Sequence, residues 1–464
     1  MLLPDPHEVR ATFSDLMAKD PEKAVAYLHE LGVSSGYIDV KAIARNVRWV
    51  SKSLGVDIEC TINLSKPEKD PLEIAAAASD VACGVDDVAV LSGVQVHRLT
   101  QHVPQCDLCW ENEGFPGTPE HPAKPGLRIV PITLGGECWG LQYSPYAYFN
   151  EHCIALSKEH RPMRIDESCF ERLIDFVDVF PFYFIGANAD LPIVGASILS
   201  HDHFQGGRHE FPLMRAPITR NVHLKGLPEL QCGIVDWPAS VLRLTSKDRA
   251  ALSKAASRIL NVWRGYSNES CDIVASSEAQ HVGSIQHNTL NFIVYKKESA
   301  YIMDLVLRNN RTDAQHPWGI FHPPESMHHI KKENIGLIEI MGMAILPPRL
   351  VNELPLVQQE LMDAARRNLS LAELEARLKS QEMIAPHAAW ATDVYDRRAA
   401  ELRETVAQQP GYPKAPFDVN NNGLHPVIQQ EVASVFVSIL KTTGVFKRNA
   451  IGAAGWNSFI DRIA

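Results

Sequence analysis

The sequence predicts an α+β protein in which a unit of strands and helices occurs twice, between a helical N-terminal segment and a helical C-terminal subdomain. The composition is that of a globular chain, with 45% apolar and 22% charged residues over 464 positions. From Gly140 onward, aromatic and β-branched runs surround one amphipathic helical pattern, and the same order of elements returns later. The predicted division has four parts: 1–60, 61–220, 221–350 and 351–464.

Charge and cysteine usage exclude several classes of function. A formal net charge of -10 argues against a nucleic-acid-binding protein, since neutralising phosphates requires clustered Lys and Arg. No signal peptide is visible, and no apolar run is long enough to span a membrane. Nine cysteines without a secretory signal indicate reduced thiols, so we expect a cytoplasmic protein.

The N-terminal part is expected to be helical because its apolar residues recur at helical spacing. Those residues are Phe13, Leu16, Ala24, Tyr27 and Leu28. Beyond position 60, the loop TINLSKPEKDP and the Gly- and Pro-rich segment 92–131 predict long ordered loops.

The first strand-and-helix unit begins with the strand-forming run LQYSPYAYFNEHCIAL. Asp166 then has the character of a helix N-cap, and the apolar stripe behind it predicts a helix packed on a sheet. The stripe consists of Phe170, Leu173, Ile174 and Val177. A pair of strands around Asn188–Leu191 ends in the motif SHDHFQGG.

The second unit repeats this order. The run QCGIVDWPASVLRLTS predicts strands, and Ser246 is the expected cap of a following helix. The inner face of that helix carries Leu252, Ala256, Ile259 and Trp263. Three further strands are expected in LNFIVYK, YIMDLVLR and IGLIEIMGMAIL, and the chain beyond Leu350 has helical periodicity.

The motif SHDHFQGG places three polar side chains on one face of an extended segment. Alternation along a strand puts His201, His203 and Gln205 on one side and Asp202 on the other. The neighbouring glycines allow a ligand phosphate to approach the backbone. Because the chain has nineteen histidines, this spacing can also arise by chance, and two core or surface histidines without a catalytic role are the alternative interpretation.

Cys106 and Cys109 lie three residues apart in a turn-rich loop and fit one half of a tetrahedral zinc site. Without a second C-x-x-C, the remaining ligands must be histidines, and His152 and His201 are the candidates. A redox pair and two unrelated buried thiols are the alternatives.

Two polar clusters are candidates for phosphate binding. Lys66 and Lys69 could clamp phosphates, or belong to a solvated charged turn with the acidic residues beside them. Arg308 and Asn309 directly follow an apolar strand, where a polar turn is the alternative reading.

Together these motifs resemble a known family. GASILSHDHFQ is similar to the active-site strand of the histidine-triad superfamily, in which a Gly-x-Ser stretch leads into H-x-H-x-Q. With TINLSKPEKDP, CDLCWENEG, LVLRNN and HIKKENIGLIEIMGMAILPPRL, the chain from about Val9 to Leu350 resembles the type 2 galactose-1-phosphate uridylyltransferases. The resemblance implies a duplicated histidine-triad-like antiparallel sheet with helices.

The resemblance also implies a reaction and its residues. It implies transfer of UMP from UDP-glucose to galactose 1-phosphate by a ping-pong mechanism through a uridylyl-histidine. His203 matches the nucleophile and Gln205 the glutamine that donates to the phosphoryl oxygens. Asn188 and Ser197 match polar groups near the nucleotide phosphates.

A structural zinc is implied at Cys106, Cys109, His152 and His201, with iron as the alternative metal. Lys66 and Lys69 match a loop contributed across a dimer interface in related enzymes, so a homodimer is expected. A second metal is not expected, because the strand before Pro347 carries Glu339, Met341 and Met343 where related enzymes have histidines.

The sequence departs from the family pattern at two points. The spacing from Ser197 to the histidines is one residue longer than usual, and Asp202 stands where proline is common. Two alternative functions stay open: a dinucleoside polyphosphate phosphorylase or hydrolase of the same superfamily, and a non-catalytic nucleotide- or zinc-binding protein. The sequence does not distinguish galactose from its N-acetylamino analogue as the sugar.

Overall fold

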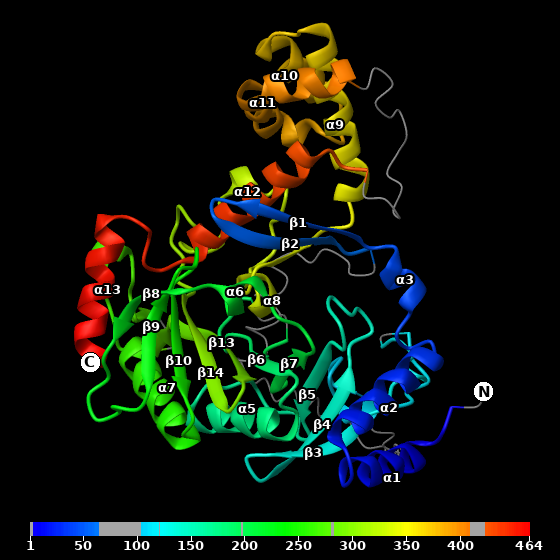
Figure 1. The fold of residues 1–464 in the computed structure, drawn as a ribbon, viewed down its shortest axis with the longest axis vertical. Coiled ribbons are helices and arrows are strands. Elements are labelled where there is room, and N and C mark those ends of the chain that lie inside the picture. Colours follow the sequence, from blue (N-terminus) through cyan, green and yellow to red (C-terminus); the bar gives the residue numbers. More distant parts are fainter. Residues whose placement is uncertain (1–2, 65–103, 120, 196–197, 280–282, 409–422) are drawn as a thin grey trace, which may run out of the picture.

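The computed structural model describes residues 3–64, 104–119, 121–195, 198–279, 283–408 and 423–464 (Figure 1). Lys66, Lys69 and Ser197 therefore lie outside the described residues. The fold is α+β and is built on one sheet of ten strands, in the order β3-β4-β5-β7-β6-β13-β14-β10-β9-β8. Every neighbouring pair in this sheet is antiparallel.

The sheet consists of two halves with the same topology, three strands followed by a helix and two more strands. The first half contains β3 (Val130–Leu134), β4 (Glu137–Tyr143), β5 (Cys153–Ser157), α5 (Glu167–Val179), β6 (Phe184–Ala187) and β7 (His203–Gly207). The second contains β8 (Ile218–Val222), β9 (Gln231–Val235), β10 (Val241–Ser246), α7 (Arg249–Arg264), β13 (Asn288–Lys297) and β14 (Ala300–Asn309). They join edge to edge through β6 and β13, so the duplication expected from the sequence is present.

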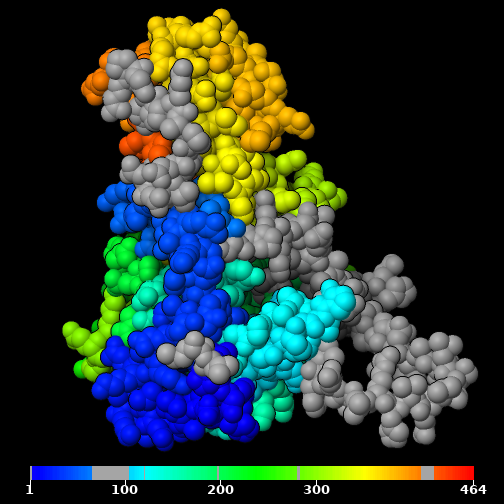
Figure 2. Space-filling view, turned by 90° about the vertical axis from the view of Figure 1, so that its right-hand side faces the viewer, coloured from blue at the N-terminus to red at the C-terminus, as the bar shows by residue number. Residues whose placement is uncertain are grey.

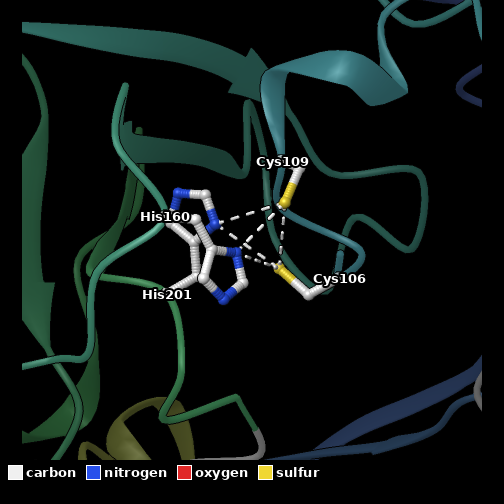
Figure 3. Close-up of side chains that lie close together, drawn as sticks. All are labelled: Cys106, Cys109, His160 and His201. Atoms are coloured by element: carbon white, nitrogen blue, oxygen red, sulfur yellow. Dashed lines mark hydrogen bonds between the residues drawn. The ribbon is translucent and has the colours of Figure 1, made fainter. Parts of the chain in front are cut away.

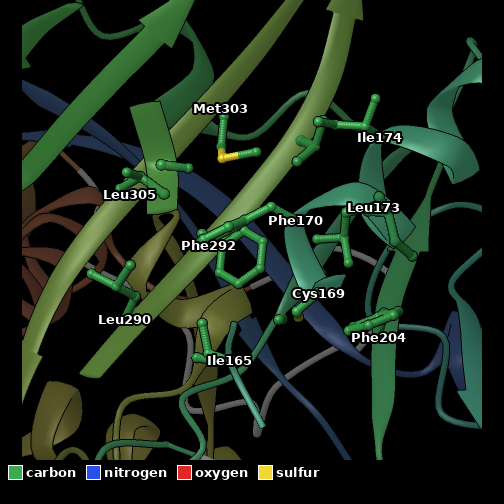
Figure 4. Packing of buried hydrophobic residues seen from close by; sticks show 14 of the residues in the cluster. Ile165, Cys169, Phe170, Leu173, Ile174, Phe204, Leu290, Phe292, Met303 and Leu305 are labelled. Atoms are coloured by element: carbon green, nitrogen blue, oxygen red, sulfur yellow. The ribbon is translucent and has the colours of Figure 1, made fainter. Parts of the chain in front are cut away.

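Helices α5 and α7 cover one face of the sheet (Figure 1). Asp166 caps α5 as predicted, its carboxylate accepting the Cys169 amide at 3.1 Å, and the four predicted stripe residues are all buried. From the sheet, Phe204 and Phe292 face the same layer, and the rings of Phe170 and Phe292 meet edge to face (Figure 4). This packing fixes which face β7 turns toward the helices.

The opposite face of the sheet is covered by shorter elements. They are α6 (Pro212–Arg215), α8 (Leu337–Ile340) and a small sheet of β1 (Val47–Ser53), β2 (Val56–Ile62) and β15 (Met343–Leu346). A two-stranded hairpin, β11 (Ser276–Ala279) with β12 (Gly283–Gln286), precedes β13. The side chains of Ile293 and Val306 pack on this second face, which is the face that bears the candidate site.

Further helices precede and follow the sheet in the sequence. The N-terminal ones are α1 (Pro6–Met17), α2 (Pro21–Ser34) and α3 (Val40–Ala44). The C-terminal ones are α9 (Leu350–Arg367), α10 (Leu371–Lys379), α11 (Ala388–Gln408), α12 (Pro426–Thr443) and α13 (Ala450–Ile463). Helices α9 to α11 form an arm that stands above the small sheet, and α12 leads back to α13 beside α7 (Figures 1 and 2). Among the described residues, no helix is both long and apolar enough to cross a membrane.

Three local expectations were wrong. The N-terminal segment is not wholly helical, because Val47–Ser53 alternates buried and exposed side chains with period two and pairs with β2. The run IGLIEIMGMAIL is not one strand: it forms α8, turns at Gly342 with φ +104°, and pairs as β15 in parallel with β2. Asp248 rather than Ser246 caps α7, since its carboxylate accepts the Ala250 amide at 2.8 Å.

The register shows what the second half has in place of the motif on β7. Gly186 pairs with Gln205 in the first half, Ile293 pairs with Asp304 in the second, and Gly186 and Ile293 pair with each other. Asp304 therefore occupies the position of Gln205, and Ile302, two residues earlier, occupies that of His203. An apolar side chain at that position leaves the second half without a nucleophile of its own.

A buried ion pair stabilises this second half. The Arg243 guanidinium donates to both oxygens of Asp304, at 2.6 and 2.9 Å, and Asp304 is fully buried. We expect Asp304→Ala to lower the free energy of unfolding by about 3–5 kcal/mol, because the buried guanidinium keeps its hydrogen bonds to the Leu213 and Ala216 carbonyls but loses its counter-charge. Urea titration measures this. Replacing both partners, in Arg243→Met/Asp304→Leu, should recover most of the loss, and a cost below about 1 kcal/mol for Asp304→Ala would contradict the assignment.

Candidate active site and metal centre

Alternation along β7 separates its side chains into two sets. Phe204 points toward the helical layer, where its ring stacks on Trp139 with centroids 4.8 Å apart. His203 and Gln205, on either side of it, point to the opposite face and line a cavity of about 520 Å³. Asp202 points away from that cavity, and its carboxylate lies 3.5 Å from Arg161 Nε.

The cavity lies between the sheet and two segments that close over it. One wall comes from the cysteine loop, with Leu108 and Lys124. Another comes from residues 333–339, the stretch that leads into α8. On the sheet side, Asn188, at the end of β6, joins His203 and Gln205. The volume is of the size that holds a small organic ligand.

His203 is held in one tautomer. Its Nδ1 lies 2.8 Å from the backbone carbonyl oxygen of His201, which can only accept, so Nδ1 carries the proton. The ring is 7% exposed, and burial lowers its pKa to about 4. A neutral imidazole is therefore present at ordinary pH, with the lone pair on Nε2. Such a nitrogen can act as a nucleophile.

The two cysteines lie beside two histidines (Figure 3). The sulfur atoms of Cys106 and Cys109 are 3.7 Å apart. Nδ1 of His201 is 3.4 and 3.8 Å from these sulfurs, and Nδ1 of His160 is 3.8 and 3.2 Å from them. Tetrahedral zinc bonds of about 2.3 Å to sulfur and about 2.0 Å to nitrogen would place sulfur and nitrogen atoms about 3.5 Å apart. The four atoms fit such an ion.

The orientation of His201 and the types of donor atom agree with this fit. His201 Nε2 donates to the Ser157 carbonyl at 2.9 Å, which turns the Nδ1 lone pair toward the sulfurs. The hydrogen bond between the two cysteines lowers the pKa of Cys109 and raises that of Cys106, so the pair by itself favours one thiolate, on Cys109. Two thiolates and two imidazoles are a usual donor set for zinc.

The ligand set differs from the expected one in one residue. His160, not His152, completes the group, and His152 lies at the cavity with Nε2 3.2 Å from Gln205 Oε1. His160 follows β5 by three residues, and β5 pairs with β7 through Leu156 and His203, which brings the strand end beside His201. No sequence spacing carries that information, since it depends on how the strands pair.

The remaining predicted residues have different surroundings. Asn188 lines the cavity, and its Oδ1 accepts the Leu337 amide at 2.9 Å. Arg308 is buried and donates to the Ile335 carbonyl at 3.0 Å, and burial lowers its pKa to about 10. Asn309 donates to Asn288 Oδ1 at 2.7 Å. Neither Arg308 nor Asn309 is among the cavity residues of the described chain.

The structure places two glutamates in the cavity wall, paired with a buried lysine that is not itself among the described cavity residues. Lys331 is fully buried, with Nζ 2.7 Å from Glu333 and 2.6 Å from Glu339, and both carboxylates line the cavity. Burial opposes the charge on Lys331, but the two glutamates outweigh it and raise its pKa. Asn334 lies between them in sequence and is buried at the cavity, where its side chain is hydrogen-bonded to His322.

Comparisons with known proteins agree with this geometry. Residues 1–162 match the family model of the galactose-1-phosphate uridyl transferase N-terminal domain, and residues 171–380 match that of its C-terminal domain. A galactose-1-phosphate uridylyltransferase of Clostridium acetobutylicum is 41% identical, over 99% of this chain and 82% of its own length. One of Caldanaerobacter subterraneus is 43% identical, over 99% and 81%.

Among solved structures, the chain is similar to the yeast Ap4A phosphorylase Apa2, with a TM-score of 0.35, 11% identity, and coverage of 68% of this chain and 84% of that one. This likeness is too distant to bear on function. The matched family models and the full-length relatives carry the assignment: the chain is a transferase that belongs to the galactose-1-phosphate uridyl transferase family.

Proposed function

We propose that the protein transfers UMP from UDP-glucose to galactose 1-phosphate, through a covalent uridylyl group on His203. The observation that carries this proposal is the neutral, buried imidazole of His203, whose Nδ1 proton is fixed and which lines the cavity beside Gln205. The printed name of the full-length relatives supports the choice of substrates.

The proposed reaction has two displacement steps. In the first, His203 Nε2 attacks the α-phosphorus of UDP-glucose, a P–N bond forms, and the bond from that phosphorus to the bridging oxygen breaks. Glucose 1-phosphate leaves as a stable anion and needs no strong general acid. In the second, a phosphate oxygen of galactose 1-phosphate attacks the same phosphorus and releases neutral His203. Asp202, which points away from the cavity, takes no part in either step.

The protein's contribution is to place donors around the phosphoryl group. Gln205 adjoins His203 on the cavity face and is proposed to donate to the phosphoryl oxygens. Asn188 and Asn334 are proposed to contact the substrate from the sheet and from the opposite wall. Arg308 is proposed to act indirectly, by holding the Ile335 carbonyl next to that wall.

Three further predicted residues complete the proposal. Lys66, Lys69 and Ser197 lie outside the described residues and stay proposed phosphate contacts. The two lysines are proposed to act across a homodimer interface. The four-part division at positions 60, 220 and 350 likewise stays a proposal.

The metal is proposed to be zinc with a structural role, with iron as the alternative. Cys106, Cys109, His160 and His201 would supply four protein ligands, which leaves no coordination position for a substrate. The bound ion would contribute rigidity: it would tie the cysteine wall of the cavity to the residue two positions before His203. The cysteines of the described residues are free thiols, which supports a proposed cytoplasmic location.

The pH dependence of the first step tests the state of His203. With UDP-glucose alone, we expect the single-turnover rate to stay level from pH 8 to about pH 5 and to fall only near pH 4, since the pKa of His203 is lowered to about 4 and only the neutral ring attacks. UDP-glucose itself has no phosphate group that titrates in this range. A pH-jump measurement keeps exposure to acid short. An acid limb near pH 6.5 would contradict a desolvated nucleophile.

The overall reaction is tested by product analysis. Incubation with UDP-glucose and galactose 1-phosphate should give UDP-galactose and glucose 1-phosphate in equal amounts, with no free UMP. Transfer of the nucleotidyl group to water, which gives a nucleoside monophosphate, would instead indicate a hydrolase. Transfer to inorganic phosphate, which gives a nucleoside diphosphate, would indicate a phosphorylase. Tight binding of UDP-glucose without turnover would indicate a non-catalytic protein.

A further inference from the structure

His152 is a buried histidine beside the proposed nucleophile, and it is not part of the cysteine–histidine group. It is 3% exposed, and its Nε2 lies 3.2 Å from Gln205 Oε1. The ring packs against Phe149 and Tyr148, with centroids 4.5 and 5.4 Å away. Its only polar side-chain contact in the described part of the chain is therefore the amide of Gln205.

The backbone holds His152 close to β7. Cys153, the next residue, pairs with Gly206, and the Ser144 amide donates to the His152 carbonyl at 2.8 Å. Gly207 has φ +150°, and a Cβ there would lie 2.5 Å from the Glu151 carbonyl oxygen. Glycine at 207 thus allows the chain before β5 to lie directly against β7. The imidazole and the amide are fixed relative to each other.

The direction of the hydrogen bond follows from what each atom can do. Burial keeps His152 neutral, with its pKa lowered to about 4, so the ring carries one N–H. Its Nδ1 is buried and has no partner among the described residues. A proton on Nδ1 would leave a buried donor unpaired, which is rarer and costlier than an unpaired acceptor. The proton is therefore on Nε2, which donates to Gln205 Oε1.

This bond decides which end of the Gln205 amide faces the cavity. An amide has an acceptor at one end and two donors at the other, and the two orientations differ by a half turn. With Oε1 engaged by His152, the NH₂ group is the end left for the cavity that His203 also lines. In the reverse orientation, the carbonyl oxygen would face the negative oxygens of a phosphoryl group and repel them.

We propose that His152 is a positioning residue that fixes the Gln205 amide with its NH₂ group toward the phosphoryl group under attack. This inference rests on the proposed function, since it assumes that Gln205 acts as a donor to the reacting phosphate. Its expected effect is on the rate of the chemical step, because the interaction strengthens as charge develops on the phosphoryl oxygens.

A double-mutant cycle in single-turnover experiments with UDP-glucose tests the proposal. Gln205→Leu is expected to slow uridylylation by about 10²-fold, the usual cost of removing one such donor. His152→Leu should slow it by about 10- to 10²-fold, with less than a threefold change in the dissociation constant of UDP-glucose. The double variant should be no slower than Gln205→Leu, because His152 acts only through Gln205.

Conservative and packing variants separate positioning from structure. His152→Gln can place an amide N–H near the position of Nε2 and should restore the rate to within about threefold of wild type. Phe149→Leu removes packing from the same ring without touching Gln205, so it should lower the melting temperature with less than a threefold effect on rate. Should His152→Leu not fold, His152→Phe replaces it in the cycle.

The outcomes are distinct from those of the proposed function. If wild type forms no uridylyl adduct, the proposed function fails. If the wild-type protein forms the uridylyl adduct and His152→Leu forms it at a rate within threefold of wild type, only the positioning role fails. Multiplicative losses in the double variant would likewise overturn that role, as they would show that His152 acts independently of Gln205.

Discussion

Replacing His203 by alanine is expected to abolish uridylyl exchange, with a loss on the order of 10⁴-fold or more. The loss should be this large because the proposed reaction passes through a bond to His203 Nε2, and the register places Ile302, not a second histidine, at the equivalent position of the other half. Isotope exchange between glucose 1-phosphate and UDP-glucose measures the first step alone.

The control is a test that this variant still folds. His203 is not among the four residues around the candidate metal, so His203→Ala should keep the metal content and a near-wild-type melting temperature. His203→Asn serves as a second variant that retains a polar side chain. Residual exchange above about 1% of wild type in both variants would show that another group carries the uridylyl.

Removing a metal ligand is the second change with a large expected effect. We expect His160→Ala and Cys106→Ser each to lower the metal content below one per chain and to destabilise the protein by about 4 kcal/mol or more. The reason is that the cysteine loop and the segment before β7 would lose their common ion, and the three remaining ligand side chains would be left without it. Elemental analysis and thermal unfolding measure both effects.

The matched control distinguishes the two histidines that could complete the ligand set. His152→Leu should keep its full metal content, since His152 Nε2 contacts Gln205 rather than the sulfurs. The opposite result, in which metal is lost from His152→Leu and kept in His160→Ala, would support the ligand set expected from the sequence, with His152 in place of His160. Elemental analysis of the wild-type protein decides between zinc and iron.

Local patterns predicted much of the scaffold and the main residue of the site. Asp166 and the stripe behind it predicted α5 because capping and helical periodicity act within a few residues. Alternation along SHDHFQGG predicted that His201, His203 and Gln205 share a face from which Asp202 is excluded. His203 and Gln205 do line the cavity, whereas His201 precedes β7 and lies beside the cysteines. The repeated order of strands and helices predicted the duplicated sheet.

Contacts that depend on strand pairing escaped prediction. His160 reaches the cysteines only because β5 and β7 are neighbours. Lys331 lies between Glu333 and Glu339, and Glu339 belongs to α8. The sequence had predicted a single strand for the apolar run that forms α8 and β15. In such cases the local pattern identifies residue types, while the fold decides which of these residues meet: His160 is 54 and 51 residues from the two cysteines, and Lys331 is 2 and 8 residues from its glutamates.

The two histidines of SHDHFQGG therefore have separate roles. His201 turns Nδ1 toward the cysteines, while its backbone carbonyl accepts the Nδ1 proton of His203. The candidate metal site and the proposed nucleophile are thus linked through one residue.

The central claim is the covalent intermediate on His203, and peptide mapping by mass spectrometry tests it most directly. After incubation with UDP-glucose alone and a rapid quench at alkaline pH, a uridylyl group should be found on the peptide that contains His203. Galactose 1-phosphate added before the quench should remove it and yield UDP-galactose. An unmodified His203 peptide from enzyme that is active in exchange, or an adduct on another residue, would contradict the account.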